Sequence, residues 1–143
     1  MSFVSVTRLR LRSVRYLPGF GLHTTRSLRQ VKAAPGFRHG AVLVDLRLAF
    51  WTLTMWDEQA SMRHYMSDGS HRQAMPYLLK WCDEASIVHW THETDALPSW
   101  DEADRRMRGE GRPSKVLRPS SDHAGLTFKP TNRAFGGSIT RLA

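Results

Sequence analysis

The chain has 143 residues, of which 41% are hydrophobic and 24% are charged, the composition of one globular domain. No apolar run approaches the roughly 18 residues that cross a bilayer, so the sequence predicts no membrane span. Cys82 is the only cysteine, which excludes an intrachain disulfide and favours a reducing compartment, the cytoplasm. The net charge of +8 lies entirely in the first part of the chain, because no acidic residue precedes Asp45.

The segment 3–12, FVSVTRLRLR, alternates with a period of two residues. This period predicts a strand, with one face that turns from apolar to basic at Arg8, Arg10 and Arg12. The alternative is an Arg-rich transit peptide, which requires an amphipathic helix, and arginines two residues apart do not share one helical stripe. We therefore favour the strand, and we expect that a strand beginning so early leaves no room for a cleavable leader.

The next elements follow from apolar spacing and from helix signals. In chain order they are a helix over 16–33 with Pro18 in its first turn, strands over 40–45 and 49–56, a helix capped by Asp57 and interrupted near 67–70, and a strand over 86–93. The order β-α-β-β-α-β is that of a ferredoxin-like α+β domain with an antiparallel sheet.

The last third of the chain is less regular. Ser99 and Glu102 form a capping box for a short helix that we expect to end near residue 108. Beyond it Gly, Pro, Ser and basic residues predict an extended arm, and the stretch from Leu126 to the end is expected to be a mobile basic tail. The predicted organisation is therefore an α+β domain over 1–95, followed by a short helix and arm over 96–143.

The strand over 49–56 has two unlike faces. Trp51, Leu53 and Met55 form a strongly apolar face, and the other face carries Thr52 and Thr54. Helices are expected on one side of the sheet only, so the other side has to be buried elsewhere. The pattern predicts a homodimer that buries it against a second copy.

A family resemblance appears at residues 54–75, TMWDEQASMRHYMSDGSHRQAM. A strand ending in Trp56, an acidic helix start, and then Tyr65, Ser67 and His71 resemble the antibiotic-biosynthesis-monooxygenase type of dimeric α/β barrel. Over 3–118, including RLRLRSVRYLPGF and PSWDEA, the chain more narrowly resembles an uncharacterised bacterial family that looks related to spheroidene monooxygenase. The resemblance implies a dimeric α/β barrel with a pocket between sheet and helices in each subunit.

Two function hypotheses follow. The first is a monooxygenase-like oxidoreductase that acts on a small apolar or aromatic substrate in the sheet–helix pocket. The second is a non-catalytic ligand-binding or structural dimer. For the first, His71 and His89 are the candidate catalytic residues, because a histidine near its ordinary pKa serves as a general base. Trp51, Tyr65 and Trp90 are the candidate substrate-binding residues, with a purely structural place in the core as the alternative for the tryptophans.

The cofactor is left open between none and heme. In the heme-degrading branch of the resembled superfamily a histidine follows the helix aromatic by ten residues, and here Met75 stands at that distance from Tyr65. Heme degradation of that kind is therefore disfavoured, although His71 or His64 could supply an axial ligand. No spacing indicates a metal site, and no motif indicates specific nucleic-acid binding; the expected partners are a second copy and a small apolar ligand.

Overall fold

The fold is described from a computed structural model, which describes residues 1–131 and 133–141. In chain order the elements are β1 (Ser2–Leu11), the 3₁₀ turn η1 (Val14–Tyr16), α1 (Leu17–Lys32), β2 (Phe37–Asp45), β3 (Ala49–Trp56), α2 (Gln59–Met66), α3 (Gly69–Trp81), β4 (Cys82–His92), α4 (Trp100–Glu110), β5 (Arg112–Pro113) and β6 (Arg133–Thr140). The β-α-β-β-α-β order of the first 92 residues is the predicted one, with the second helix in two pieces. None of the helices in the described residues is both long and apolar enough to cross a membrane.

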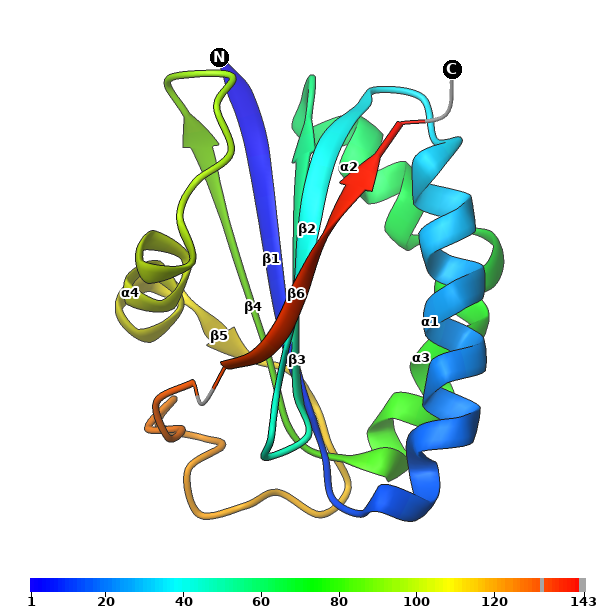
Figure 1. Ribbon diagram of the computed structural model, residues 1–143, viewed down its shortest axis with the longest axis vertical. Helices are drawn as coiled ribbons and strands as arrows, with labels where there is room; N and C mark the ends of the chain where they lie inside the picture. Colours follow the sequence, from blue (N-terminus) through cyan, green and yellow to red (C-terminus); the bar gives the residue numbers. More distant parts are fainter. Residues whose placement is uncertain (132, 142–143) are drawn as a thin grey trace.

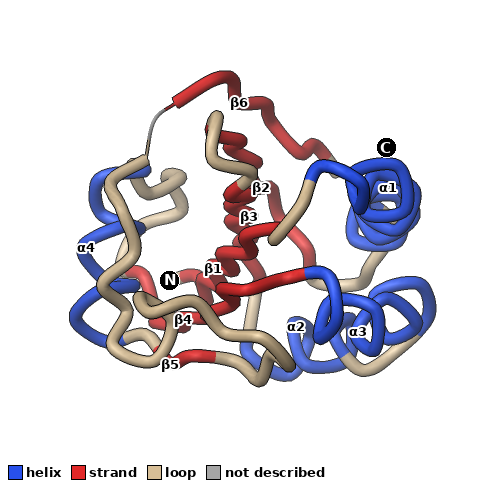
Figure 2. Tube along the Cα trace, turned by 90° about the horizontal axis from the view of Figure 1, so that it is seen from below, coloured by secondary structure: helices blue, strands red, loops and turns tan. Residues whose placement is uncertain are grey.

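The strands form one antiparallel sheet in the order β5-β4-β1-β3-β2-β6. Helices α1, α2 and α3 lie on one face of this sheet (Figure 1). Helix α4 and the chain that follows it lie on the opposite face, so the molecule has three layers when it is viewed from below (Figure 2). The four inner strands have the ferredoxin-like arrangement, which confirms the α+β fold class.

The face of the sheet toward α1–α3, here called the helix-side face, carries two separate apolar clusters. One cluster lies at the end where β1 leaves the sheet and centres on Leu11, Phe20 and Cys82. The other lies at the opposite end and contains Val31, Phe37, Trp56, Met62 and Ile139. The helices are therefore held to the sheet at its two ends, with a stretch between them that belongs to neither cluster.

The opposite face, here called the α4-side face, is covered by the chain itself. Four residues of this face are fully buried: Val4, Val6, Leu53 and Met55. They are buried because α4 and the segment after it pack on them through the side chains of Ala103, Met107 and Phe128. The expectation that a second copy buries this face rested on the premise that the chain itself leaves it bare, and that premise is wrong. The predicted short helix and arm cover the face instead.

Arg8 is the clearest departure from the predicted strand β1. The basic face of this strand is expected to be exposed to solvent. Arg8, however, is only 3% exposed and forms an ion pair of 2.7 Å with Glu84. Arg10, directly opposite Glu84 in the register, also pairs with Asp83 at 2.9 Å. These cross-strand pairs explain why β4 begins at Cys82 rather than at residue 86: opposite charges stabilise strand positions that look like a turn in isolation.

The predicted ends of the helices and of the C-terminal segment agree with the structure at some positions and differ at others. The Ser99 hydroxyl accepts a hydrogen bond from the Glu102 amide at 3.1 Å, so Ser99 is the N-cap of α4 as predicted, whereas the Glu102 carboxylate accepts from Arg106. Helix α2 begins one residue later than predicted, with Glu58 at the N-cap, and Asp57 instead accepts a hydrogen bond from Ser61. The mobile tail is wrong for residues 133–140, which form β6 along the edge of β2.

The packing of Phe128 on the α4-side face predicts how much its removal lowers the free energy of unfolding. The Phe128 ring is 3% exposed and lies 4.1 Å from the Arg8 guanidinium, so we expect Phe128→Ala to lower the free energy of unfolding by about 3 kcal/mol. The matched control Phe135→Ala removes a ring that is 62% exposed and should change it by no more than about 0.5 kcal/mol. Urea denaturation at low protein concentration measures both. Equal, small losses would contradict a packed arm.

Candidate active site

The uncovered middle of the helix-side face is lined by small polar side chains. Ser5 of β1 stands in register with Thr54 of β3 and with His89 of β4. One pleat further on, Thr7 stands in register with Thr52 and Ile87. Because side chains at every second position share one face, these two rows both point toward the helices. They lie between the two apolar clusters.

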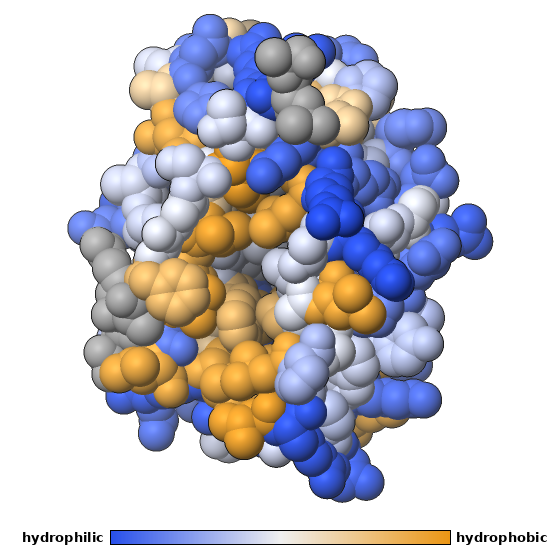
Figure 3. Space-filling model, turned by 45° about the vertical axis from the view of Figure 1, so that its right-hand side comes forward, coloured by the Kyte–Doolittle hydropathy of each residue, from blue (hydrophilic) through white to orange (hydrophobic). Residues whose placement is uncertain are grey.

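The space above the Thr7–Thr52 row is open, whereas Ser5 and Thr54 of the other row are buried. Thr7 and Thr52 belong to inner strands and face the helix layer, yet neither is buried, so the helices do not close on them. Figure 3 looks between β6 and α1 and shows a hollow there whose walls are largely apolar. A concave, mostly apolar space with a few polar groups is the usual form of a small-molecule site. We call it the sheet–helix hollow.

His89 is the titratable residue of these rows. Its Nε2 is buried and has no hydrogen-bond partner within residues 1–131 and 133–141, and its ring lies 5.6 Å from the ring of Phe3. Burial lowers the pKa of His89 below the ordinary histidine value, and the charges of Arg112 and Arg63 lower it further. His89 is therefore neutral at pH 7, which is the form that accepts a proton.

Tyr65 and His71 lie together at the junction of α2 and α3. Their ring centroids are 4.9 Å apart, and Tyr65 also lies 5.4 Å from Trp56 at the end of β3. Gln30 of α1 holds this junction, because its amide donates to the carbonyls of Tyr65 and Asp68 while its oxygen accepts from the His71 amide. The predicted pair is thus fixed by a residue that carried no sequence signal of its own.

The protonation states of this pair follow from their surroundings. His71 Nδ1 lies 3.2 Å from the Met66 carbonyl, and since a carbonyl only accepts, Nδ1 carries the proton and Nε2 carries the lone pair. Burial lowers the pKa of His71, although the hydrogen bond to Met66 acts in the other direction. Burial also raises the pKa of Tyr65, against the bond that its hydroxyl donates to the Ser27 carbonyl. Both side chains are neutral at pH 7.

The five predicted site residues do not share one place. Tyr65, His71 and His89 belong to the helix side, whereas Trp51 and Trp90 belong to the cluster on the α4-side face. Trp51 is 2% exposed and meets Trp100 and Phe128 edge to face. The sheet therefore separates these two tryptophans from the sheet–helix hollow.

The polar floor of the hollow was not predicted as part of a site. The signal was present: Ser5 and Thr7 in one strand, and Thr52 and Thr54 in another, alternate with large apolar residues. Two strands with small polar residues on the same face, paired side by side, leave a space that larger side chains would fill. His89 and His92 lie on opposite faces as predicted, because His92 accepts from Trp90 Nε1 on the α4 side.

The arrangement can supply a neutral base and an apolar, walled space. Among the residues that the structure describes, no three His, Cys, Asp or Glu side chains gather as metal ligands would. The hollow offers a ligand the hydroxyls of Thr7 and Thr52 and aromatic surface, and the buried Nε2 of His89 belongs to the neighbouring row.

Comparisons with known proteins agree with this fold. The family model described as "Domain of unknown function (DUF3291)" matches residues 16–111. Among curated proteins none matches the chain. Solved structures are similar in fold at low identity, so they establish the architecture and not an activity.

Three of these solved structures show the extent of the likeness. SnoaB, a cofactor-independent oxygenase from Streptomyces nogalater, is 15% identical with a TM-score of 0.54, over 68% of this chain and 98% of its own. A conserved protein from Methanosarcina mazei Go1 is 14% identical with a TM-score of 0.58, over 65% and 94%. An antibiotic biosynthesis monooxygenase is 8% identical with a TM-score of 0.57, over 64% and 99%. The antibiotic-biosynthesis-monooxygenase-like fold is thus confirmed.

Burial of neutral His71 predicts a pH dependence of stability. Its pKa is lower in the folded than in the unfolded chain, so the unfolded chain binds more protons once the pH falls below about 6.5. We expect the free energy of unfolding to decrease between about pH 7.5 and about pH 5.5, and His71→Gln to decrease that pH dependence.

The control is His64→Gln, since His64 is an exposed histidine of α2. Urea denaturation at both pH values measures the three proteins. An unchanged pH dependence in His71→Gln would contradict the buried, neutral ring.

Proposed function

Because the chain belongs to the DUF3291 family of domains of unknown function, and its fold is that of the antibiotic-biosynthesis monooxygenases, we propose that it is a monooxygenase-like oxidoreductase. The proposed substrate is a small, flat aromatic molecule with an acidic hydroxyl. It binds in the sheet–helix hollow, and it reacts with O₂ without a bound cofactor.

The observation that carries this proposal is the unpartnered Nε2 of His89. A buried nitrogen without a partner is unfavourable by about 1–3 kcal/mol, and a ligand hydroxyl that donates to it would remove that cost. The threonine hydroxyls beside it give further polar contacts, and the apolar walls receive the ring. SnoaB, which has the same fold, is named a cofactor-independent oxygenase, and this supports the absence of a cofactor.

The chemistry needs only the substrate, O₂ and a base. His89 Nε2 takes the hydroxyl proton and leaves an electron-rich phenolate. The phenolate carbon gives one electron to O₂, and the two radicals combine to form a carbon–oxygen bond. The resulting peroxide loses its outer oxygen as water, with the proton from His89 and the hydrogen of that carbon, and leaves a quinone. With 1-naphthol the balance is C₁₀H₈O + O₂ → C₁₀H₆O₂ + H₂O.

Tyr65 and His71 have a separate part in this proposal. The neutral Tyr65 ring forms part of the apolar cluster at one end of the hollow, where a flat substrate would stack on it. His71 stabilises the orientation of that ring and holds its lone pair on Nε2. Should a heme bind instead, this nitrogen is the one that would ligate the iron.

We test the base with 1-naphthol, by O₂ uptake at an electrode and by the absorbance of the quinone product. The wild-type protein should consume O₂, and His89→Gln should lower the rate by roughly 10²–10⁴-fold, the range for loss of a general base. The control is His92→Gln, on the same strand but the opposite face of the sheet, which should keep the wild-type rate.

Quenching of tryptophan fluorescence measures binding in the same samples. Binding of 1-naphthol without O₂ uptake would overturn the enzyme and favour the alternative, a ligand-binding protein. Equal rates in His89→Gln and wild type would overturn the role of His89.

The location and the partner of the chain also remain proposals. We propose the cytoplasm, because the only cysteine of the sequence, Cys82, is a free thiol, and a chain without a disulfide suits a reducing compartment. We propose a homodimer, though not through the α4-side face. Strand β6 lies at the edge of the sheet, and an edge strand is a template for antiparallel pairing with its own copy.

Phe135 tests the edge-paired dimer. It is 62% exposed on β6, so Phe135→Lys should place two charges at the twofold axis and shift the sedimentation coefficient to that of a monomer at concentrations where wild type is dimeric. Leu22→Lys is the control on α1, where Leu22 is 51% exposed. A wild-type protein that stays monomeric at high micromolar concentration contradicts the dimer.

A further inference from the structure

A second cavity lies on the α4-side face, away from the sheet–helix hollow. Its volume is about 340 Å³, and its walls come from β1, β4, the β2–β3 turn and the segment after β5. The lining consists of Arg8, Arg10, Arg47, Glu84, Ser120, Ser121, Asp122 and Lys129. This volume lies in the range of small-molecule sites and holds on the order of ten water molecules.

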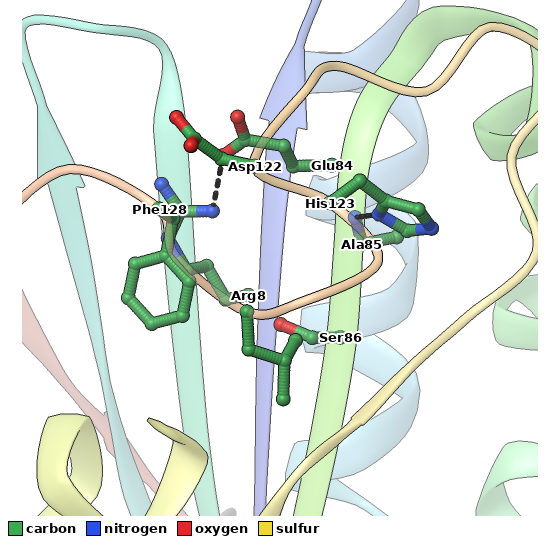
Figure 4. A pocket seen from close by; sticks show the side chains of 8 residues that line it. Arg8, Glu84, Ala85, Ser86, Asp122, His123 and Phe128 are labelled. Atoms are coloured by element: carbon green, nitrogen blue, oxygen red, sulfur yellow. Dashed lines mark hydrogen bonds and ion pairs between the residues drawn. The ribbon is translucent and has the colours of Figure 1, made fainter.

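Arg8 forms the floor of this cavity. Figure 4 shows the adjoining crevice, where Arg8 lies between the Phe128 ring and the Glu84 carboxylate. Its side chain is 4% exposed and its Nη1 pairs with Glu84 at 2.7 Å. Its Nε, however, has no hydrogen-bond partner in the described part of the chain. A guanidinium has five N–H donors, so the pair with Glu84 leaves Arg8 incompletely hydrogen-bonded.

Glu84 is already occupied on both oxygens. One oxygen accepts from Arg8 and the other from the Ser120 hydroxyl at 2.7 Å. Burial alone would raise the pKa of Glu84, but these hydrogen bonds from Ser120 and Arg8 hold it below its ordinary value. Glu84 is therefore a fixed anion that neutralises Arg8 and has little left to offer a cation.

The rim of the cavity is cationic. Arg47 and Lys129 are both exposed, and no carboxylate of residues 1–131 or 133–141 lies within ion-pair distance of either. Arg47 donates to the Pro130 carbonyl at 2.8 Å, which fixes its guanidinium beside Lys129. Arg10, whose Nε donates to the Arg47 carbonyl, completes the wall. The lining thus holds four cationic and two anionic side chains.

We propose that this cavity binds a small molecule through an oxyanion, a phosphate or a carboxylate. Arg47 and Lys129 contact the oxyanion, because neither pairs with a carboxylate of the described residues. Arg10 lines the same cavity, and a guanidinium can donate two parallel hydrogen bonds to a phosphate or a carboxylate. The Ser121 hydroxyl, which also lines the cavity, is placed to bond the uncharged part of the ligand, whereas that of Ser120 is held by Glu84. The site lies on the other side of the sheet from the hollow, so it stands independently of the proposed oxygenase reaction.

The test uses isothermal titration calorimetry on the full chain with two probes, inorganic phosphate and citrate, at matched ionic strength. The variant is the double substitution Arg47→Gln with Lys129→Gln. Both side chains are exposed, so folding should be unaffected, which circular dichroism checks. The control is Arg26→Gln with Arg29→Gln on the exposed surface of α1, which removes the same charge far from the cavity.

We expect saturable binding of at least one probe to the wild type and to the control. In the Arg47/Lys129 variant the apparent Kd should rise about tenfold or more, since two charge-assisted hydrogen bonds are lost. Phosphate binding without citrate binding assigns a phosphate ligand, and the reverse assigns a carboxylate ligand. Absence of binding of both probes, or an equal loss in the α1 control, would overturn the proposal, because net charge alone would then explain any attraction.

Discussion

The structure depends on one constraint: the sheet has two apolar faces, and a single chain has to cover both. Helices α1, α2 and α3 cover the helix-side face at its ends, and α4 with Phe128 covers the other face. A sheet of this kind with one bare face would need a partner to hide it. Here the last third of the chain provides the second cover, and this decides where the charges and the cavities lie.

The ion pair of Arg8 with Glu84 exists because of that second cover. Two charges taken out of water are favourable only with good geometry and further hydrogen bonds. Ser120 supplies such a bond to Glu84, and the Phe128 ring supplies a face for the guanidinium. Both come from the segment after α4, so the pair and the segment stabilise each other. Arginines at alternate positions of β1 are thus part of the core at Arg8 and part of a cavity wall at Arg10.

Much of the fold was predictable, because it depends on local periodicity. The alternation of β1, the Pro18 helix start and the Ser99 cap each carry their signal within a few residues. What failed depends on contacts between distant segments. Asp83 and Glu84 resemble a turn until Arg8 and Arg10 are placed opposite them, and the glycines of 136–137 resemble a tail until β2 is beside them. Of the candidate site, His89 and the Tyr65–His71 pair were predicted from residue type and stay predictions. The face of the sheet on which Trp51 and Trp90 lie could be assigned only once the packing of the sheet was known.

The sheet–helix hollow owes its chemistry to what its floor lacks. Serine and threonine side chains on two paired inner strands are too small to reach the helices, so they leave space. Each also supplies a hydroxyl group that is polar but uncharged. In such surroundings a neutral histidine is more favourable than a charged one. In the proposed reaction the proton transfer creates an imidazolium and a phenolate, which attract each other strongly because the local dielectric constant is low. Burial also removes both ions from water, so the proposed base step depends on a close contact between His89 Nε2 and the phenolate oxygen.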